Sequence, residues 1–412
     1  MSANGGNEHA QPPASLLAGV RVLDLTNVLS GPYATYQMAM LGAEVIKVEN
    51  PSEGDLARKL GASPALNAQM MGTSFLAQNA GKKSVTIDLK HPVGKDLFAA
   101  LLATADVVIE NFRPGVMDRL GFGYEVCRQI NPAIVYCAIS GFGQDGPLRA
   151  NPAYDQIVQG MSGVMSVTGD AESAPLRVGY PLCDTLGGMG AAFAIVSALF
   201  GRCQTGQGSY IDLSMLDSTI SAMGWAVSNY LIAGVEAKPI GNQNMTAAPS
   251  GSFQCADGQI NIAANKQEQF EKLCALIGRP ELVRDPRFAE REARKANRAA
   301  INAELNAALS ARPAAEWEEL LNAHGVPAGR ILTVPEVLAH PQIAARDLVH
   351  EIPMDEPGLP SVKVVRTGFR LGDSQPGAQS APPRLGADNA DIFGALGKDA
   401  AALAELKARG AI

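Results

Sequence analysis

The stretch LAGVRVLDLTNVLSGPYATYQMAMLGAEVIKVE, residues 17–49, decides the fold class of this chain. Residues 20–25 predict a short buried strand, and Pro32 stands where a helix begins. Gly42 marks the end of that helix, and residues 44–49 predict the next strand. A strand–helix–strand unit of about thirty residues is the outline of a nucleotide-binding fold. The stretch therefore predicts an α/β domain.

Further strand candidates follow at residues 84–89, 107–110 and 134–139, with helical stretches between them. This alternation predicts an open parallel sheet with helices on both faces. Ligands of such sheets bind beyond the carboxyl ends of the strands. The dinucleotide fingerprint GxGxxG is missing, because the first turn contains only Gly31. A dinucleotide-dependent oxidoreductase is therefore disfavoured.

The composition is that of a soluble globular protein. The chain has 412 residues, is 47% hydrophobic and carries a formal net charge of −7, so nothing global attracts nucleic acid or an anionic membrane. Its six cysteines form no CxxC pair, and its five histidines form no HxH or HExxH spacing. We therefore expect reduced thiols, a cytoplasmic location and no metal site.

Composition also divides the chain into parts. Residues 1–15 are polar and lack the features of a signal peptide, so they predict a disordered tail. We assign residues 16–225 and 330–412 to a large domain, and residues 226–329 to a linker and a small α+β domain. The longest apolar run, residues 186–201, has four glycines and is too short for a bilayer span, so it predicts a buried helix.

A single charge, Asp184, interrupts the apolar, glycine-rich segment between Arg177 and Arg202. Burying an unpaired charge is costly, so this carboxylate needs a role. Two roles fit: the cap of a helix that begins at Thr185, or a nucleophile that the helix start holds ionised. The neighbouring Cys183 is either a nucleophile or a packing cysteine, and no His stands near it in sequence.

Several basic residues near the predicted strand ends are able to meet phosphates despite the acidic total. The alternative is that they form a solvated surface. These residues are Lys82, Lys83, Lys90, Arg113 and Arg119.

The ordered motifs of the chain resemble those of the class III CoA-transferases, the CaiB/BaiF family of formyl-CoA transferase and carnitine CoA-transferase. The resemblance runs from about Leu17 to the C-terminus. Besides residues 17–49 and the Asp184 segment, it is carried by Gly54-Asp55 with Arg58, KKSVTIDLKHPVGKDL (82–97), ENFRPGVMDRLGFGYE (110–125), AYDQIVQGMSGVMSVTG (153–169) and TGQGSYIDLSML (205–216).

The resemblance implies a Rossmann-like large domain made by both chain ends, a smaller domain between them, and a homodimer of two interlocked rings. It implies a CoA-transferase (EC 2.8.3) with Asp184 as the catalytic nucleophile, which passes through an aspartyl-acyl anhydride and an aspartyl-CoA thioester. Its substrates would be an acyl-CoA and a small carboxylic acid, with no tightly bound cofactor. The implied CoA-binding positions are Leu29, Asp88, Leu89, Lys90, Asn111, Phe112, Arg113 and Arg119.

The oxyanions of such a path need N–H donors, for which Gly187, Gly188 and the linker loop are candidates. The linker loop spans residues 234–252, and residues 241–250 (GNQNMTAAPS) within it are the nearest counterpart of the glycine-run loop of formyl-CoA transferase, which is absent here. Whether this segment acts as an active-site loop is left open.

The chain departs from formyl-CoA transferase at further positions. That enzyme has a Gln at Leu29, an Arg at Asn50 and a Glu at the substrate position Asp155, so oxalate and formate are disfavoured. Residues 175–179 (PLRVG) resemble the branch that handles succinyl-CoA and C4–C6 dicarboxylic acids such as itaconate, mesaconate, citramalate and glutarate. In that branch Arg177 either clamps the distal carboxylate or is a surface residue.

Two alternatives remain beside CoA transfer. The related α-methylacyl-CoA racemases have a His immediately before the Asp at position 155, where this chain has Tyr154. A phenol is poorly suited to removing an α-proton at neutral pH. The alternative from another class is a non-catalytic CoA-binding protein.

Overall fold

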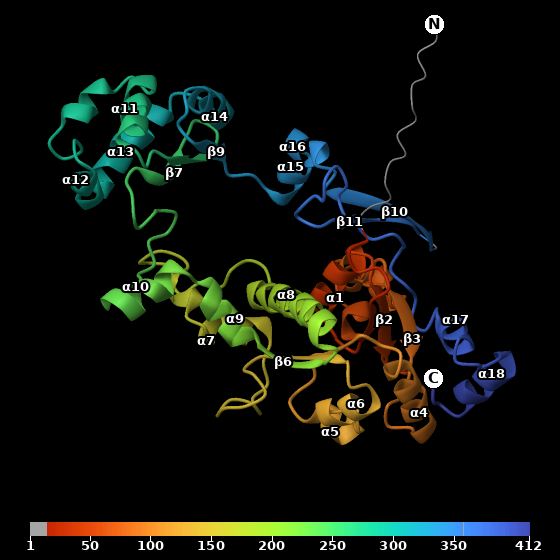
Figure 1. Cartoon of the computed structure of the whole chain (residues 1–412). Helices are drawn as coiled ribbons and strands as arrows, with labels where there is room; N and C mark the ends of the chain where they lie inside the picture. The colour runs from red at the N-terminus through yellow and green to blue at the C-terminus, as the bar shows by residue number, and fades with distance from the viewer. Residues whose placement is uncertain (1–14, 357) are drawn as a thin grey trace, which may run out of the picture. The chain divides into compact units, whose positions relative to one another are not determined.

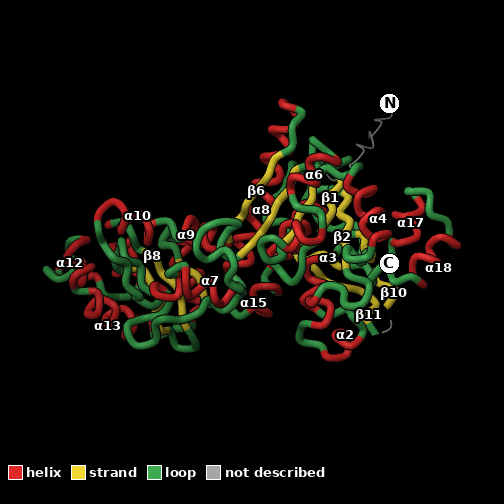
Figure 2. Tube along the Cα trace, turned by 90° about the horizontal axis from the view of Figure 1, so that it is seen from below, coloured by secondary structure: helices red, strands yellow, loops and turns green. Residues whose placement is uncertain are grey.

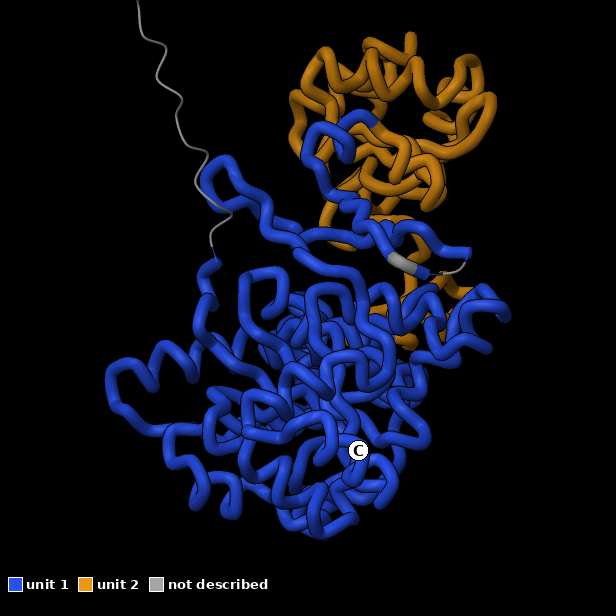
Figure 3. Tube along the Cα trace, turned by 90° about the vertical axis from the view of Figure 1, so that its right-hand side faces the viewer, with its two compact units in different colours: residues 1–164, 178–234, 341–412 blue, residues 165–177, 235–340 orange. Residues whose placement is uncertain are grey.

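A computed structural model of the chain describes residues 15–356 and 358–412. The predicted tail, residues 1–15, therefore lies outside the described residues except for Ser15. The chain divides into two compact units, which Figure 3 shows in different colours. Unit 1 contains the chain up to Val164 together with residues 178–234 and 341–412, and unit 2 contains residues 165–177 and 235–340.

The unit boundaries at 234/235 and 340/341 lie later in the chain than the domain boundaries that we expected at 225/226 and 329/330. The reason is that helix α10 (Trp225–Ala233) belongs to unit 1 and helix α15 (Val334–Leu338) to unit 2. The short segment 165–177 also joins unit 2, where the N–H of Gly241 donates to the carbonyl of Gly169 at 2.7 Å.

Unit 1 contains the predicted parallel sheet, with six strands in the order β3-β2-β1-β4-β5-β6. Figure 1 labels β2, β3 and β6 of this sheet. The strand order reverses between β1 and β4, and this is the point at which ligands of such sheets bind. The strands are β1 (Arg21–Asp24), β2 (Glu44–Glu49), β3 (Lys83–Thr86), β4 (Val107–Glu110), β5 (Val135–Ser140) and β6 (Ser209–Ser214).

Apolar cores cover both faces of this sheet, as the alternation of strands and helices predicts. One face packs against α1 (Ser30–Met40), α7 (Asp155–Met161) and α8 (Leu182–Thr205). The other face packs against α4 (Pro92–Leu102), α5 (Val116–Leu120), α6 (Tyr124–Ile130), α17 (Asn389–Gly394) and α18 (Ala400–Ala408). Unit 1 is therefore a doubly wound α/β unit made by both ends of the chain.

The remaining elements of unit 1 surround this core. An antiparallel hairpin, β10 (Val349–Glu356) and β11 (Leu359–Val365), packs with α1 and α3 (Thr73–Asn79). The other helices are α2 (Pro64–Ala68), α9 (Met215–Ala222), α10 and α16 (Pro341–Ala345), with short 3-10 helices at Leu56–Lys59 and, at the boundary with unit 2, Val164–Val167.

Helix α8 differs from the buried helix that we expected. It has 24 residues, and by length and apolar composition it is the one helix among the described residues that would suffice to cross a membrane. Its inner face, with Ala191, Ile195 and Leu199, is buried in the core of unit 1. On its outer face Phe193 and Phe200 are 75% and 69% exposed, because nothing within the described chain covers them.

Unit 2 has a three-stranded antiparallel sheet in the order β7-β8-β9 with helices around one apolar core. Figure 2 labels β8, α12 and α13 of this unit. This architecture is α+β. Its strands are β7 (Ser250–Gln254), β8 (Gln259–Ala263) and β9 (Ala328–Arg330). Its helices are α11 (Gln267–Leu276), α12 (Arg291–Ala296), α13 (Arg298–Leu309), α14 (Ala314–Ala323) and α15, with a 3-10 helix at Pro280–Arg284.

Candidate active site

Asp184 lies within the first turn of α8. The helix begins at Leu182 with Pro181 as its N-cap, so the interpretation of Asp184 as the cap of a helix starting at Thr185 is wrong. Asp155, at the start of α7, takes this role from outside the helix. Its Oδ1 accepts the N–H of Cys183 at 2.8 Å and that of Asp184 at 3.4 Å. Since these N–H groups have no partner inside α8, Asp155 leaves the carboxylate of Asp184 available for other contacts.

The surroundings of Asp184 do not hold it ionised as the helix-start interpretation expected. Burial, together with the nearby carboxylate of Asp155, raises the pKa of Asp184 to about 7. These two effects on the pKa outweigh the opposite effect of the helix start, whose positive end stabilises the ionised carboxylate. The site therefore contains a carboxyl group that changes charge near neutral pH.

A cavity of about 200 Å³ places Asp184 beside residues that follow four strands of the sheet, β1, β4, β5 and β6. Leu29 and Ser30 follow β1, and Asn111 and Phe112 follow β4. Its remaining lining residues are Asn27, Val28, Ile139, Ser140, Gly141, Ala153, Tyr154 and Met215. The cavity thus lies at the carboxyl edge of the sheet, next to the point where the strand order reverses.

Two neighbouring cavities share residues with this one and contain other predicted CoA positions. A cavity of about 280 Å³ is lined by Asp88, Leu89, Lys90 and Phe112, together with Asn50 and other residues. A cavity of about 200 Å³ is lined by Arg113 and again by Phe112. Phe112 thus lines all three cavities, which together bring most of the predicted CoA positions to one edge of the sheet.

Four of the basic or substrate candidates lie elsewhere. Lys83 is half-exposed and pairs with Glu44 at 2.7 Å, and it lines none of the three cavities. Lys82 is buried and pairs with Asp24 at 3.0 Å, so the prediction that it meets a phosphate is wrong. Arg119 is exposed on α5, and its neighbours Val116 and Leu120, rather than Arg119 itself, line the 280 Å³ cavity. Arg177 is exposed and belongs to unit 2.

The loop after β1 is held in place by side chains from other elements. Asn111 exchanges two hydrogen bonds of 2.8 Å with the backbone of Asn27. Asp55 accepts the N–H of Val28 at 3.0 Å. Val28 has a φ of 67°, a left-handed conformation that is rare for a β-branched residue. Such strained residues persist where their surroundings fix them, often at functional sites.

A buried ionic network beneath this loop is a feature that sequence reasoning missed. Lys47 pairs with Asp55 at 2.9 Å and donates to the carbonyl of Thr26 at 2.7 Å. Asp24 accepts the N–H of Thr26 at 2.9 Å and pairs with Lys82. Charged residues inside apolar strand runs, such as Lys47 in EVIKVE, were the available signal, because buried charges are normally paired.

Gly187 and Gly188 allow two helices to approach closely rather than donating hydrogen bonds to an oxyanion. They lie beyond the first turn of α8, where backbone N–H groups are used within the helix. A Cβ at Gly188 would lie 2.4 Å from the carbonyl oxygen of Ser30, and a Cβ at Gly187 would lie 3.1 Å from its hydroxyl oxygen. The missing side chains therefore bring the start of α1 against α8, close to Asp184.

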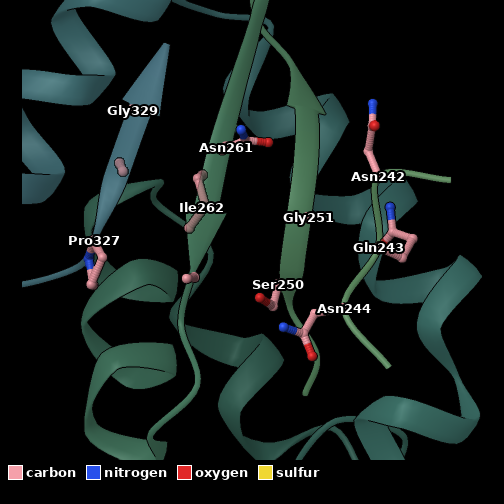
Figure 4. A pocket seen from close by; sticks show the side chains of 11 residues that line it. Asn242, Gln243, Asn244, Ser250, Gly251, Asn261, Ile262, Pro327 and Gly329 are labelled. Carbon is pink, nitrogen blue, oxygen red and sulfur yellow. The ribbon is translucent and has the colours of Figure 1, made fainter. Parts of the chain in front are cut away.

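The segment 241–250 lines a cavity of about 460 Å³ in unit 2, which Figure 4 shows from close by. Asn242, Gln243 and Asn244 lie beside β7, and Asn261 comes from β8. The amide side chains of this cavity can donate and accept hydrogen bonds. No cluster of His, Cys, Asp and Glu residues that could hold a metal occurs among the residues described.

Comparison with known proteins gives consistent matches over most of the chain. The model of CoA-transferase family III matches residues 17–389. Over 89% of this chain and 93% of the relative, the sequence is 43% identical to acetyl-CoA:oxalate CoA-transferase from Acetobacter aceti. It is 36% identical to succinyl-CoA:glutarate CoA-transferase from Mus musculus, over 90% of this chain and 84% of the relative.

A solved structure supports the same match. The crystal structure of a CAIB/BAIF family protein from Brucella suis superposes with a TM-score of 0.81 and 37% identity. The match covers 92% of this chain and 99% of that chain.

Proposed function

The chain belongs to CoA-transferase family III, and from this premise we propose that it moves CoA from succinyl-CoA to a C4–C6 dicarboxylate, with Asp184 as the nucleophile. The resemblance found in the motifs is thereby confirmed, and the protein is an enzyme of the EC 2.8.3 type that uses CoA thioesters. The observation that carries the proposal is the position of Asp184, whose carboxyl group faces a cavity at the ligand-binding edge of the sheet.

The reaction proceeds in four substitutions at carbonyl carbons. The Asp184 carboxylate attacks the thioester carbon of the acyl-CoA, a C–O bond forms, and the C–S bond breaks to give a mixed anhydride and CoA thiolate. The thiolate attacks the aspartyl carbon and expels the donor acid as its carboxylate, which leaves an aspartyl-CoA thioester. The acceptor carboxylate attacks the aspartyl carbon of this thioester and expels the thiolate, which gives a second mixed anhydride. The thiolate then attacks the acyl carbon of the acceptor, which forms the new acyl-CoA and releases the Asp184 carboxylate. Every step conserves charge and needs no proton.

The residues at the strand ends supply the binding surface in this proposal. Leu29, Asp88–Lys90 and Asn111–Arg113 hold CoA along the three cavities that share Phe112. The exposed cations Lys90 and Arg113 suit its phosphates. Arg119 is proposed as a further phosphate contact, because its helix α5 borders the cavity.

The acceptor is proposed to be a dicarboxylate because this feature is common to the named relatives, whose acceptors are oxalate and glutarate. Asp155 orients the first turn of α8 and so acts on the acceptor site through Asp184. That Arg177 binds the distal carboxylate through two parallel hydrogen bonds stays a prediction, because Arg177 belongs to unit 2 and does not line the cavity of Asp184. The absence of a Gln at Leu29 and an Arg at Asn50 still favours a longer acid over oxalate.

We also infer that the enzyme works as a homodimer of interlocked rings. The large apolar side chains on the outer surface of unit 1 support this inference. Phe193 and Phe200 on α8, and Trp225, Leu231 and Ile232 on α10, are all more than half exposed. Apolar surface of this extent is typical of a protein–protein interface. Light scattering after size exclusion tests it: a monomer at micromolar concentration would contradict the inference.

One experiment tests donor, acceptor and nucleophile together. The purified enzyme is incubated with succinyl-CoA, acetyl-CoA or formyl-CoA and a panel of acids that includes oxalate, and the CoA esters are identified by mass spectrometry. We expect succinyl-CoA with a C4–C6 dicarboxylate to give the highest turnover. Hydroxylamine added during turnover should modify position 184. Turnover without any modification there would overturn the aspartyl mechanism.

A further inference from the structure

We propose that the hydroxyl group of Ser30 is a catalytic hydrogen-bond donor to the side-chain oxygen of Asp184 while the aspartyl carbon is tetrahedral. This proposal rests on the proposed role of Asp184 as nucleophile. It assigns to Ser30 the role of oxyanion donor, which Gly187 and Gly188 do not fill because their N–H groups are used within α8.

The first observation is an unpartnered polar atom. Ser30 is only 3% exposed, and its Oγ has no hydrogen-bond partner. Buried hydroxyl groups normally have one, because an unsatisfied buried polar group is costly. Among the described residues, Ser30 is the one with such an orphaned side-chain atom that also lines the cavity of Asp184. The unused donor and the residue that carries the reacting carboxyl group therefore line the same cavity.

The second observation is the packing of α1 on α8. The Ser30 hydroxyl lies against α8 at Gly187, where a Cβ would come within 3.1 Å of it. Asp184 is three residues before Gly187 and four before Gly188, so these three residues share one face of the helix. The hydroxyl therefore meets the same face of α8 that carries Asp184.

The third observation is that the backbone before Ser30 is fixed. Asn27 and Val28 are held by Asn111 and Asp55, so the start of α1 is set before any ligand binds. The positive end of α1, a helix of 11 residues, also lies at this point. Preorganised donors of this kind stabilise charge that develops during a reaction without having to reorient.

Two of the four substitutions pass through a tetrahedral aspartyl carbon. Thiolate attack on the anhydride forms the C–S bond and moves the C=O electron pair onto the oxygen of Asp184, and collapse breaks the C–O bond to the donor acid. Acceptor attack on the thioester forms a C–O bond and breaks the C–S bond in the same way. The Ser30 proton stays on Oγ throughout, so the residue stabilises the oxyanion without transferring a proton.

The test is Ser30→Ala in the full-length enzyme. We expect kcat to fall by about 10²-fold, with KM for succinyl-CoA and affinity for CoA unchanged. Ser30→Cys, which keeps a weak donor, should recover part of the rate. Ser162→Ala is the matched control, because its buried hydroxyl bonds the carbonyl of Gln159 and does not line the Asp184 cavity. The control should keep the kcat of the wild type.

A second readout separates catalysis from structure. After rapid acid quench with succinyl-CoA, intact-protein mass spectrometry distinguishes an acyl adduct from a CoA adduct. In Ser30→Ala the adduct should shift toward the acyl anhydride, because the steps at the aspartyl carbon are slowed. A normal kcat, a normal distribution of adducts, or a loss that follows CoA affinity or melting temperature would overturn the proposal.

Failure of this proposal can be told from failure of the proposed function. If the wild type forms no adduct at position 184, the nucleophile itself is misassigned, and the Ser30 proposal fails with it. If the wild type forms the adduct and Ser30→Ala forms and resolves it at the same rate, only the role of Ser30 is wrong.

Discussion

Asp24 and Asp184 both lie at the carboxyl edge of the sheet in unit 1, but their surroundings differ. Asp24 is fully buried, and although burial opposes its ionisation, Lys82 and Lys47 outweigh that effect and lower the pKa of Asp24 well below its usual range. For Asp184, burial and the neighbouring Asp155 both act to raise the pKa. The carboxylate of Asp24 is paired with Lys82 and holds the loop after β1, whereas the carboxyl group of Asp184 is available to react with a ligand.

Two groups of residues at one edge of the sheet therefore have different roles, one structural and one in the proposed reaction. The network of Asp24, Lys47, Asp55 and Lys82 positions the loop that leads to Ser30. The cavity of Asp184 then contains the Ser30 hydroxyl group, which has no hydrogen-bond partner. Proteins tolerate such incomplete sites where function requires them.

The sharpest way to break the comparison is to remove the carboxyl group of Asp184. Asp184→Ala should lower CoA transfer by at least about 10⁴-fold, because a covalent nucleophile is lost, while binding of CoA measured by calorimetry persists. Asp399→Ala is the matched control, since Asp399 also stands at a helix start as the N-cap of α18. It should cost about 1 kcal/mol of stability and no activity. Substantial turnover by Asp184→Ala would remove the basis of the mechanism.

Breaking the paired charge should instead affect stability. Lys82→Met deprives buried Asp24 of its ion pair and should lower the free energy of unfolding by about 3 kcal/mol. The double variant with Asp24→Asn should recover part of this loss. Lys83→Met, which removes a half-exposed pair with Glu44, should cost less than about 1 kcal/mol. Urea unfolding measures all three. Equal losses for Lys82 and Lys83 would contradict the structural role of the network.

The pH dependence of the reaction reports Asp184 directly. Only the carboxylate form attacks, so kcat/KM should rise with pH through a midpoint of about 7, the pKa to which burial and Asp155 raise Asp184. Below the midpoint the rate should change about tenfold for each pH unit. A profile that is flat between pH 5 and 8 would show that the free enzyme keeps Asp184 ionised, as Asp24 is.

The smallest expected effect is on the stability of the site itself. The folded-state pKa of Asp184 is raised, so its contribution to stability is fully present below about pH 4 and is lost as pH rises through about 7. Asp184→Asn removes this loss and should stabilise the protein by about 1–2 kcal/mol above pH 7, with little effect at low pH. Melting temperatures at pH 5 and pH 8 measure the difference. Destabilisation at pH 8 would reverse the inferred sign.

Sequence patterns predicted the regular elements of unit 1 well. The strand at residues 44–49 and the strand at 107–110 have the predicted bounds, because runs of apolar β-branched residues between turn signals leave few other conformations. The start of α8 was misplaced because its cap, Asp155, comes from another element.

The candidate site was only partly accessible from sequence. The motifs pointed to Asp184, Asn111 and Phe112, which share one cavity in the structure. They gave no indication of Ser30 as an unpartnered donor, since a serine at a helix start is an ordinary feature of sequences. They left Lys82 open between a phosphate contact and a solvated surface, whereas in the structure it is buried and paired with Asp24. A lysine near a strand start looks the same in sequence in all three situations.

The sequence by itself determined the parallel α/β architecture, the family and the residue type at position 184, because these depend on local periodicity and on ordered motifs. The tertiary structure alone decided which charges are paired, which helix starts are capped by a residue of another element, and which buried polar groups have no hydrogen-bond partner. Such properties arise from contacts between residues far apart in the chain, as when Asp155 meets α8 and Asp24 meets Lys82. Burial and neighbouring charge then decide whether an aspartate supports the fold or is available to react.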